Sequence, residues 1–282
     1  MRHVGILWAS CLPMLLGLSA PSGAADIRAA DLASPAPSPA PAAEGWIITL
    51  KGNASVSTEW AGAKSYDLEG YPSLSFRRAD QPAIWEAPDD GFGLPVYDSP
   101  FFSIGPVARY DSGRYRSDEK KLFGIRDVPW TVEPGAYAEF WPIPDTLRAR
   151  VELRHGLNSN NGFIADAAVD YLVHVGQTTF ALGPRLGLGD QDLMRKEFGV
   201  SLTDALQNGI VTPYKPNGGL RSAGVATSVT YDLSKTWSTT VYGGYDRMVA
   251  DAAKSPLVRK LGSPDQFRAG LTVSYSFGFS GF

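Results

Sequence analysis

The sequence predicts an all-β protein, an antiparallel transmembrane β-barrel of twelve strands, with ten strands as the alternative. Three observations lead to this prediction. The first 25 residues read as a secretory signal peptide. From Trp46 onward, short runs of alternating apolar and polar residues are separated by turn residues. After Asp26, no uninterrupted apolar run approaches the roughly 18 residues that a membrane-spanning helix needs.

Residues 1–25 show the three parts of a signal peptide. Arg2 supplies the positive start, residues 4–18 are mostly apolar, and residues 22–25 are small residues suited to cleavage. A lipoprotein signal around Cys11 is the alternative, but it would need a small or aliphatic residue where Trp8 stands. Cys11 is the single cysteine, so the rest of the chain has neither a disulfide framework nor a thiolate metal site.

Residues 26–45 are expected to form a Pro/Ala-rich periplasmic leader. Residues 34–43 alternate proline with small residues, a composition that favours solvated polyproline II and cannot pack a core. At about 3.1 Å per residue, these ten residues reach roughly 30 Å. The leader is therefore long enough to meet periplasmic partners close to the membrane. The barrel is expected to occupy residues 46–282.

The alternating runs within residues 46–282 are the expected strands. Apolar and polar residues alternate most clearly in 147–154, 163–173, 179–188, 225–231, 237–245 and 271–277. Ten such runs are clear, and two are doubtful, near Ala83–Tyr97 and Lys196–Ser201. A barrel with both ends in the periplasm needs an even number of strands. With twelve, some of the tight turns between runs would lie outside the cell.

The connections between the runs differ in length. Pro142–Asp145, His174–Gln177 and Asp232–Lys235 are tight turns, whereas Asp111–Thr131 and Asp251–Pro264 are long polar loops. Short turns at one end and long loops at the other are typical of outer-membrane barrels. A soluble β-sandwich would show the same alternation, but the signal peptide, the lack of later cysteines and the unequal loops favour the membrane barrel.

Charged residues occupy one face of neighbouring runs. If the apolar residues point to lipid, the polar ones point into the lumen, because an Arg on the lipid side costs about 2–4 kcal/mol at mid-membrane. The expected lumen charges are Arg148, Arg150, Glu152, Arg154, Asp166, Asp170 and Arg185. The arginines outnumber the acids on adjacent runs, so an open pore would favour anions. The net charge of −3 gives no support to nucleic-acid binding.

No catalytic or metal-binding motif stands out. The sequence has no Gly-x-Ser-x-Gly elbow, no phosphate-binding loop and no His-Glu-x-x-His. His155 and His174 lie at a strand end and in a tight turn, where surface roles are the ordinary interpretation. Asp190, Asp192 and Glu197 could offer oxygen ligands to a hard cation, but ordinary loop acids explain them better. We therefore expect no enzyme activity, no cofactor and no metal.

A succession of short motifs extends from about residue 46 onward. They are Tyr71-Pro72, Gly105-Pro106 with Arg114, Leu122 and Gly124, Gly183–Gly187 with Asp190, Phe198–Ser201, Gly219-Leu220, Tyr231–Ser234 with Trp237, Tyr245–Met248, Asp251-Ala252, Ser255–Val258 and Tyr275–Phe277. Together they resemble the MltA-interacting protein (MipA) family, also called the OmpV-like outer-membrane proteins. Two features depart from the family pattern, namely the Pro/Ala leader and the extension from Gly278 to Phe282.

The resemblance implies a barrel in the outer membrane of a Gram-negative bacterium, in contact with outer-membrane lipid. It further implies a non-enzymatic scaffold that links a lytic transglycosylase to a peptidoglycan synthase during murein growth. The alternatives are a narrow outer-membrane channel and a surface antigen or adhesin.

Overall fold

The computed structural model describes residues 45–80, 83, 85–157 and 162–279. The expected signal peptide, and all but the last residue of the expected leader, lie outside the described residues. Within the described part of the chain, no helix is both long and apolar enough to cross a membrane.

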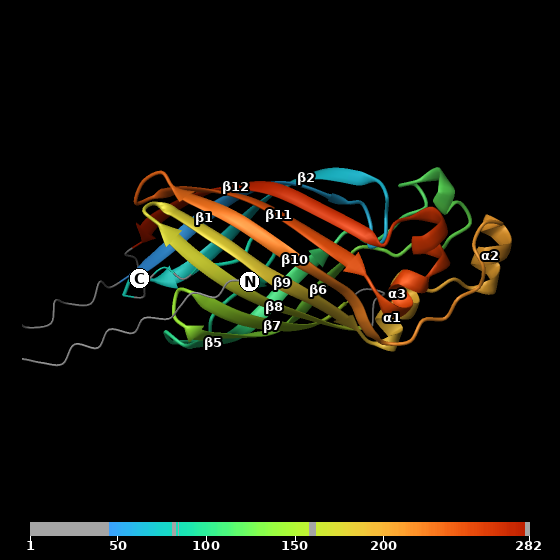
Figure 1. The fold of residues 1–282 in the computed structure, drawn as a ribbon, viewed down its shortest axis with the longest axis horizontal. Coiled ribbons are helices and arrows are strands. Elements are labelled where there is room, and N and C mark those ends of the chain that lie inside the picture. The colour runs from blue at the N-terminus through green and yellow to red at the C-terminus, as the bar shows by residue number, and fades with distance from the viewer. Residues whose placement is uncertain (1–44, 81–82, 84, 158–161, 280–282) are drawn as a thin grey trace, which may run out of the picture. The chain divides into compact units, whose positions relative to one another are not determined.

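The described residues form one antiparallel sheet of twelve strands that curls into a nearly closed barrel (Figure 1). The strands are β1 (Trp46–Thr58), β2 (Tyr66–Arg78), β3 (Phe92–Gly93), β4 (Tyr97–Asp98), β5 (Phe102–Asp111), β6 (Thr131–Ile143), β7 (Leu147–His155), β8 (Phe163–Val175), β9 (Thr178–Gly189), β10 (Gly219–Asp232), β11 (Trp237–Met248) and β12 (Asp265–Phe279). Their order around the sheet is β2-β1-β12-β11-β10-β9-β8-β7-β6-β5-β3, and β4 also pairs with β5.

The expected all-β class and the strand number of twelve are confirmed, although two of the twelve strands are only two residues long. β3 and β4 pair with successive parts of β5, so they form one interrupted path beside it. They lie in the doubtful region Ala83–Tyr97. The other doubtful strand, Lys196–Ser201, is wrong: helix α1 (Gln191–Phe198) ends within it, and only Val200 makes an isolated bridge, to Tyr214.

The barrel turns its apolar residues outward. Along β7, Val151 and Leu153 are 50% and 52% exposed, whereas Arg148 is fully buried. β8 and β9 repeat the arrangement, with Val169 and Leu182 exposed. Because successive side chains of a strand point to opposite faces, this parity places the apolar residues of every such strand on the outside. A soluble protein buries those residues, so the exposed belt indicates lipid as the surroundings.

The tight turns lie together at one end of the barrel. His174 contacts the carbonyl oxygen of Asp145 at 2.9 Å, and the Tyr231 hydroxyl donates to Gln177 at 3.1 Å, so neighbouring turns touch. β1 begins at the same end, since Trp46 pairs with Phe279 at the end of β12. All three expected tight turns are therefore at one end. The two-residue strands β3 and β4 do not cross the barrel, so the ten long strands make the crossings and every tight turn falls at the same end.

The long loops fold together at the opposite end into a small structure that we call the cap, comprising residues 59–65, 112–130, 190–218 and 249–264. It holds η1 (Lys120–Leu122), α1, α2 (Leu202–Asn208), α3 (Ala250–Lys254) and the π-helix η2 (Leu257–Leu261). Helix α2 begins with a capping box, in which Ser201 and Asp204 bond each other's backbone N–H at 3.0 Å.

The cap has its own hydrophobic core. Trp60, Leu122, Val200 and Leu257 come from four different loops and are buried against one another. A second cluster gathers Met194, Phe198, Met248, Ala252 and Val258. Burial of this kind stabilises loops that the barrel strands alone would leave in solvent. Figure 1 shows the helices gathered at this end, away from the first residues of β1.

One seam interrupts the barrel. Within the described residues, β2 forms a ladder with β1 alone, and no ladder crosses from β2 to β3. Pro72 lies in the middle of β2, and it has no N–H to donate to a strand on the open side.

Candidate functional site

The barrel interior is filled by charged side chains from the inner faces of β6 to β12. Parity decides which residues face inward: along β7, Arg148, Arg150, Glu152 and Arg154 are all buried, whereas the residues between them are not. The neighbouring strands contribute carboxylates, so charges of opposite sign meet across the ladders.

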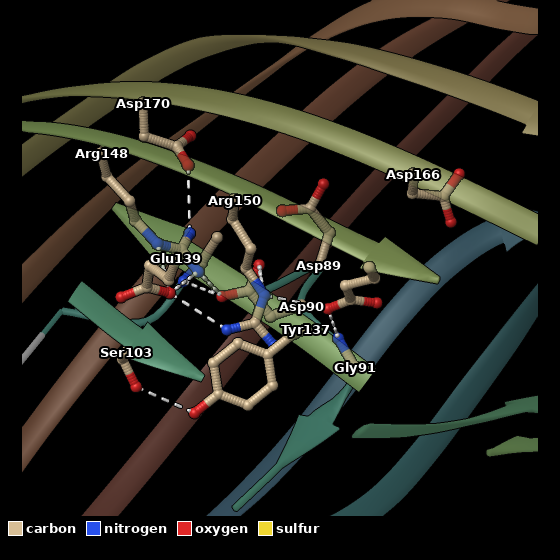
Figure 2. Close-up of polar contacts among 12 residues, drawn as sticks. Asp89, Asp90, Gly91, Ser103, Tyr137, Glu139, Arg148, Arg150, Asp166 and Asp170 are labelled. Carbon is tan, nitrogen blue, oxygen red and sulfur yellow. Dashed lines mark hydrogen bonds and ion pairs between the residues drawn. The ribbon is translucent and has the colours of Figure 1, made fainter. Parts of the chain in front are cut away.

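Arg148 has every guanidinium nitrogen paired. Its Nε donates to Glu139 at 2.9 Å, its Nη1 donates to Asp170 at 3.1 Å, and its Nη2 bonds to Asp90. The guanidinium also lies over the ring of Trp85, 5.4 Å from the centroid. Figure 2 shows Arg148 and Arg150 directed toward the same carboxylate of Glu139.

Arg150 and Arg154 extend the network along β7. Arg150 donates to Glu139 and to Glu152 at 3.0 Å each, and its guanidinium lies 3.9 Å from the centroid of the Tyr137 ring. Arg154 donates to Glu133 at 3.2 Å, to Asp166 at 2.6 Å and to Glu152. Removing one partner from such a network would leave a buried charge uncompensated.

Residues 85–91, which we call the plug, enter the barrel interior between β2 and β3. Asp89 accepts from Arg185 Nε at 2.8 Å and Nη2 at 3.1 Å, and from Arg268 Nη2 at 2.7 Å. Asp90 bonds to Arg148, and the backbone N–H of Gly91 donates to Glu152 at 3.0 Å. The plug is thus joined to β7, β9 and β12.

Packing also holds the plug. Trp85 packs against a buried cluster of Trp141, Leu172 and Ala181 on the barrel wall. A side chain at Gly91 would not fit, because a Cβ there would lie 2.6 Å from Val107 Cγ2 and 3.2 Å from the carbonyl oxygen of Ala108. The glycine therefore allows the plug to approach β5 closely.

Little space remains beside the plug. A cavity of about 10 Å³, bordered by Trp85, Asp89, Arg185, Ser228 and Arg268, has room for about one water molecule. The Ser228 hydroxyl is buried there and has no hydrogen-bond partner within the described residues.

All seven charges predicted from sequence lie within this interior network. Arg148, Arg150, Glu152, Arg154 and Asp170 are buried, Asp166 pairs with Arg154 and Arg221, and Arg185 pairs with Asp89 and Asp170. The sequence reasoning missed the other members of the network. They are Asp89, Asp90, Arg109, Glu133, Glu139, Arg221, Asp246 and Arg268.

The added carboxylates correct the expectation that arginines outnumber acids in the interior. Strand parity could have found Glu133 and Glu139, because they share the inner face of β6 with Tyr137. No sequence signal distinguished Asp89 and Asp90, since Pro-Asp-Asp-Gly reads as an ordinary turn.

The cap contains a second group of buried charges. Arg114 donates to the carbonyl oxygen of Glu197 at 2.6 Å and lies over the ring of Trp60. Burial raises the pKa of the Glu197 carboxyl to about 7 and lowers the pKa of Arg114 to about 10. One oxygen of Glu197 has no partner within the described residues. Of the other two acids considered for a cation, Asp190 caps α1 by accepting from the backbone N–H of Leu193 at 2.9 Å, and Asp192 lies in the first turn of that helix.

An antiparallel barrel with an apolar outer belt, a charged interior, short turns at one end and long loops at the other is an outer-membrane β-barrel protein. A family model described as MltA-interacting protein MipA matches residues 52–277, and the chain belongs to this family. This family and the barrel architecture together locate the chain in the outer membrane of a Gram-negative bacterium.

Solved outer-membrane proteins are similar to this chain at low identity. The KdgM porin is 12% identical with a TM-score of 0.37, over 82% of this chain and 99% of that one. An outer-membrane channel from Pseudomonas putida F1 is 13% identical with a TM-score of 0.40, over 83% and 96%. The NanC porin is 11% identical with a TM-score of 0.37, over 81% and 98%. No curated protein sequence matches the chain at a significant level.

Proposed function

We propose that this protein is a non-enzymatic scaffold that holds a murein lytic transglycosylase and a peptidoglycan synthase at the inner surface of the outer membrane. The family description names an interaction with MltA, and the family match extends over most of the barrel. A scaffold needs a stable membrane anchor and a periplasmic surface, and it does not need a pore.

The filled lumen is the observation that carries this proposal. Arg148 has no exposed surface, and the plug bonds to β7, β9 and β12 across the interior. A barrel of about eight strands is filled by side chains, whereas one of about sixteen leaves a channel. Here ten long strands enclose a network in which each arginine of β7 contacts at least two carboxylates.

The turn end of the barrel is the surface that we assign to the partners. β1 begins and β12 ends at this end, which is the periplasmic end of a barrel whose first and last strands both open toward the periplasm. The turns carry polar groups for recognition, among them Asp145, His174 and Gln177. The leader expected at residues 26–45 would join the barrel at the same place.

Co-purification tests the scaffold. Tagged protein, extracted gently in a mild detergent, should retain a lytic transglycosylase or a peptidoglycan synthase. A variant lacking residues 32–43 should retain less of the partner if the leader contributes, while its heat-dependent gel mobility stays unchanged. A variant with Phe123→Ser in the cap is the matched control, because Phe123 is exposed at the other end of the barrel.

Retention of neither enzyme under several mild conditions would contradict the scaffold and favour the second candidate, a narrow channel. The specific observation in favour of a channel is the charged rather than apolar interior. A surface antigen or adhesin, the third candidate, would use the cap, where Leu202 and Leu206 of α2 are exposed.

A further inference from the structure

The plug carries one carboxylate that two barrel strands hold in the manner of a bound ligand. Asp89 receives two parallel N–H bonds from Arg185 on β9 and a third from Arg268 on β12. Bidentate pairing of this kind is the geometry by which arginine recognises carboxylates, and it combines strength with orientation. We call Arg185 and Arg268 the arginine clamp.

The plug depends on such side-chain contacts because it has little backbone pairing with the wall. The ladder beside β5 starts only at Phe92. Before that point, the plug bonds mainly to itself, through Asp90 N to Ala87 O at 3.0 Å, or to side chains such as Arg109, which donates to the Asp89 carbonyl oxygen at 2.7 Å. Losing the clamp would therefore remove a principal attachment without breaking a strand ladder.

Water can approach the clamp. The side chains of Asp89 and Arg268 are 17% and 28% exposed, unlike the fully buried Arg148. The small cavity beside them is lined by Ser228, whose hydroxyl has no hydrogen-bond partner in the part of the chain that the structure describes and is an additional polar group for a ligand. A partly exposed pair such as Asp89–Arg268 exchanges partners more readily than a fully buried pair, because solvent compensates the charges when they separate.

The charges around the clamp define the ligand that could take the place of Asp89. Besides Asp89, Arg185 contacts Asp170 at 2.8 Å and Arg268 contacts Asp246 at 2.6 Å, so each arginine has a second carboxylate partner that does not belong to the plug. The vacated donors then match one further carboxylate. A neutral polyol of the same size offers only uncharged hydroxyl oxygens, which bind a guanidinium more weakly than a carboxylate does.

We propose that the arginine clamp is a binding site for a small hydrophilic solute with a carboxylate, and that Asp89 occupies this site in the plugged barrel. A solute carboxylate competes with Asp89, binds Arg185 and Arg268, and releases the plug from β9 and β12. This inference goes beyond the scaffold function and is tested separately, because co-purification reports on the partners and the experiments below report on the plug.

Gluconate and sorbitol are the matched probes, since sorbitol has the same carbon chain and hydroxyls without the carboxylate. Titration calorimetry on the refolded protein compares wild type with Asp89→Asn. A tethered competitor acts at an effective concentration on the order of millimolar, so its removal should tighten gluconate binding at least about tenfold. The double variant Asp89→Asn, Arg268→Gln should lose this gain, and sorbitol should bind none of the three proteins.

Planar-bilayer recordings supply a second readout. In about 0.15 M KCl, where exposed charges are screened beyond about 8 Å, wild type should be nearly silent and Asp89→Asn should show discrete openings. Asp80→Asn is the control, because Asp80 pairs with exposed Arg78 and does not contact the clamp. Equal gluconate affinity in wild type and Asp89→Asn, or openings in Asp80→Asn as frequent as in Asp89→Asn, would overturn the proposal.

Wild type alone decides the question if Asp89→Asn does not refold. Gluconate at about 50 mM, well above the millimolar effective concentration of a tethered group, should induce openings that the same concentration of sorbitol does not. A wild-type barrel that stays silent in gluconate would refute the displacement of the plug.

Discussion

Glu139 on β6 and Arg148 on β7 form a buried ion pair in which two guanidinium nitrogens contact one oxygen. Nε donates to Oε2 at 2.9 Å, and Nη2 lies 2.7 Å from the same atom. The pair fixes the register of two neighbouring strands, because a shift of either strand by one residue would turn its own charged side chain toward lipid.

Changing Arg148 to Met should lower the free energy of unfolding by about 3–5 kcal/mol, because Asp90, Glu139 and Asp170 would lose a buried partner. Urea unfolding of the barrel in lipid vesicles measures this loss. Arg78→Met, at an exposed pair, should cost less than about 1 kcal/mol. Equal effects at the two sites would contradict the role assigned to the interior network.

Stability of the cap should depend on pH through Glu197. Its pKa is raised from 4.5 to about 7 in the folded protein, so folding favours the protonated carboxyl. The stabilising contribution is complete below about pH 4.5 and is lost as the pH rises through 7, with an upper limit of about 3 kcal/mol. Protection factors of cap amides, which compare the exchange rate with the intrinsic rate at the same pH, should therefore be larger at pH 5 than at pH 8.

Glu197→Gln provides the matched comparison for the pH effect. The amide cannot ionise, so this part of the pH dependence should disappear while the cap stays folded. Asp127, whose pKa is lowered in the folded protein by its bonds to Arg116, acts with the opposite sign and at lower pH. Unchanged pH dependence in Glu197→Gln would remove Glu197 as the cause.

The outer face of β7 should reject charge. Val151 is 50% exposed and lies midway along the strand, so Val151→Arg should lower the unfolding free energy in vesicles by about 2–4 kcal/mol. Leu202→Arg, on the exposed surface of α2 in the cap, should change it by less than about 0.5 kcal/mol. A tolerated arginine at position 151 would be inconsistent with lipid contact there.

The cap should loosen separately from the barrel when its core is truncated. Phe198 is 1% exposed among Met194, Met248 and Val258, and Phe198→Ala removes contacts worth about 3–5 kcal/mol. Limited proteolysis should then cut the cap faster while heat-dependent gel mobility of the barrel persists. Leu206→Ala, at an exposed site, should be cut at the wild-type rate.

Strand parity made most of the barrel predictable from sequence. The runs 147–154, 163–173 and 179–188 correspond to β7, β8 and β9 within two residues at each end. The reason is physical, because one misplaced charge on the lipid face is costly, so alternation is kept strictly. The same parity located Arg148, Arg150 and Arg154. Their partners on β6, Glu133 and Glu139, also lie on an inward face, but the alternation of apolar and polar residues along β6 is less regular.

The plug and the cap could not be predicted in the same way. Asp89 and Asp90 acquire their role from Arg185, Arg268 and Arg148, which are 58 or more positions away in sequence, and no local period marks such contacts. The error at Lys196–Ser201 has a similar origin. Phe198 and Val200 are apolar because they fill the core of the cap, and two apolar residues in alternation were interpreted as a strand.

The seam beside β2 has a mechanical consequence. A closed β-barrel has a fixed circumference, because every increase must break hydrogen bonds along a whole ladder. Within the described residues, this barrel lacks such a ladder between β2 and β3. Lateral tension in the bilayer would therefore separate the strands first between β2 and β3. No ladder of hydrogen bonds holds the two strands together there, and Pro72 has no N–H to donate across the gap.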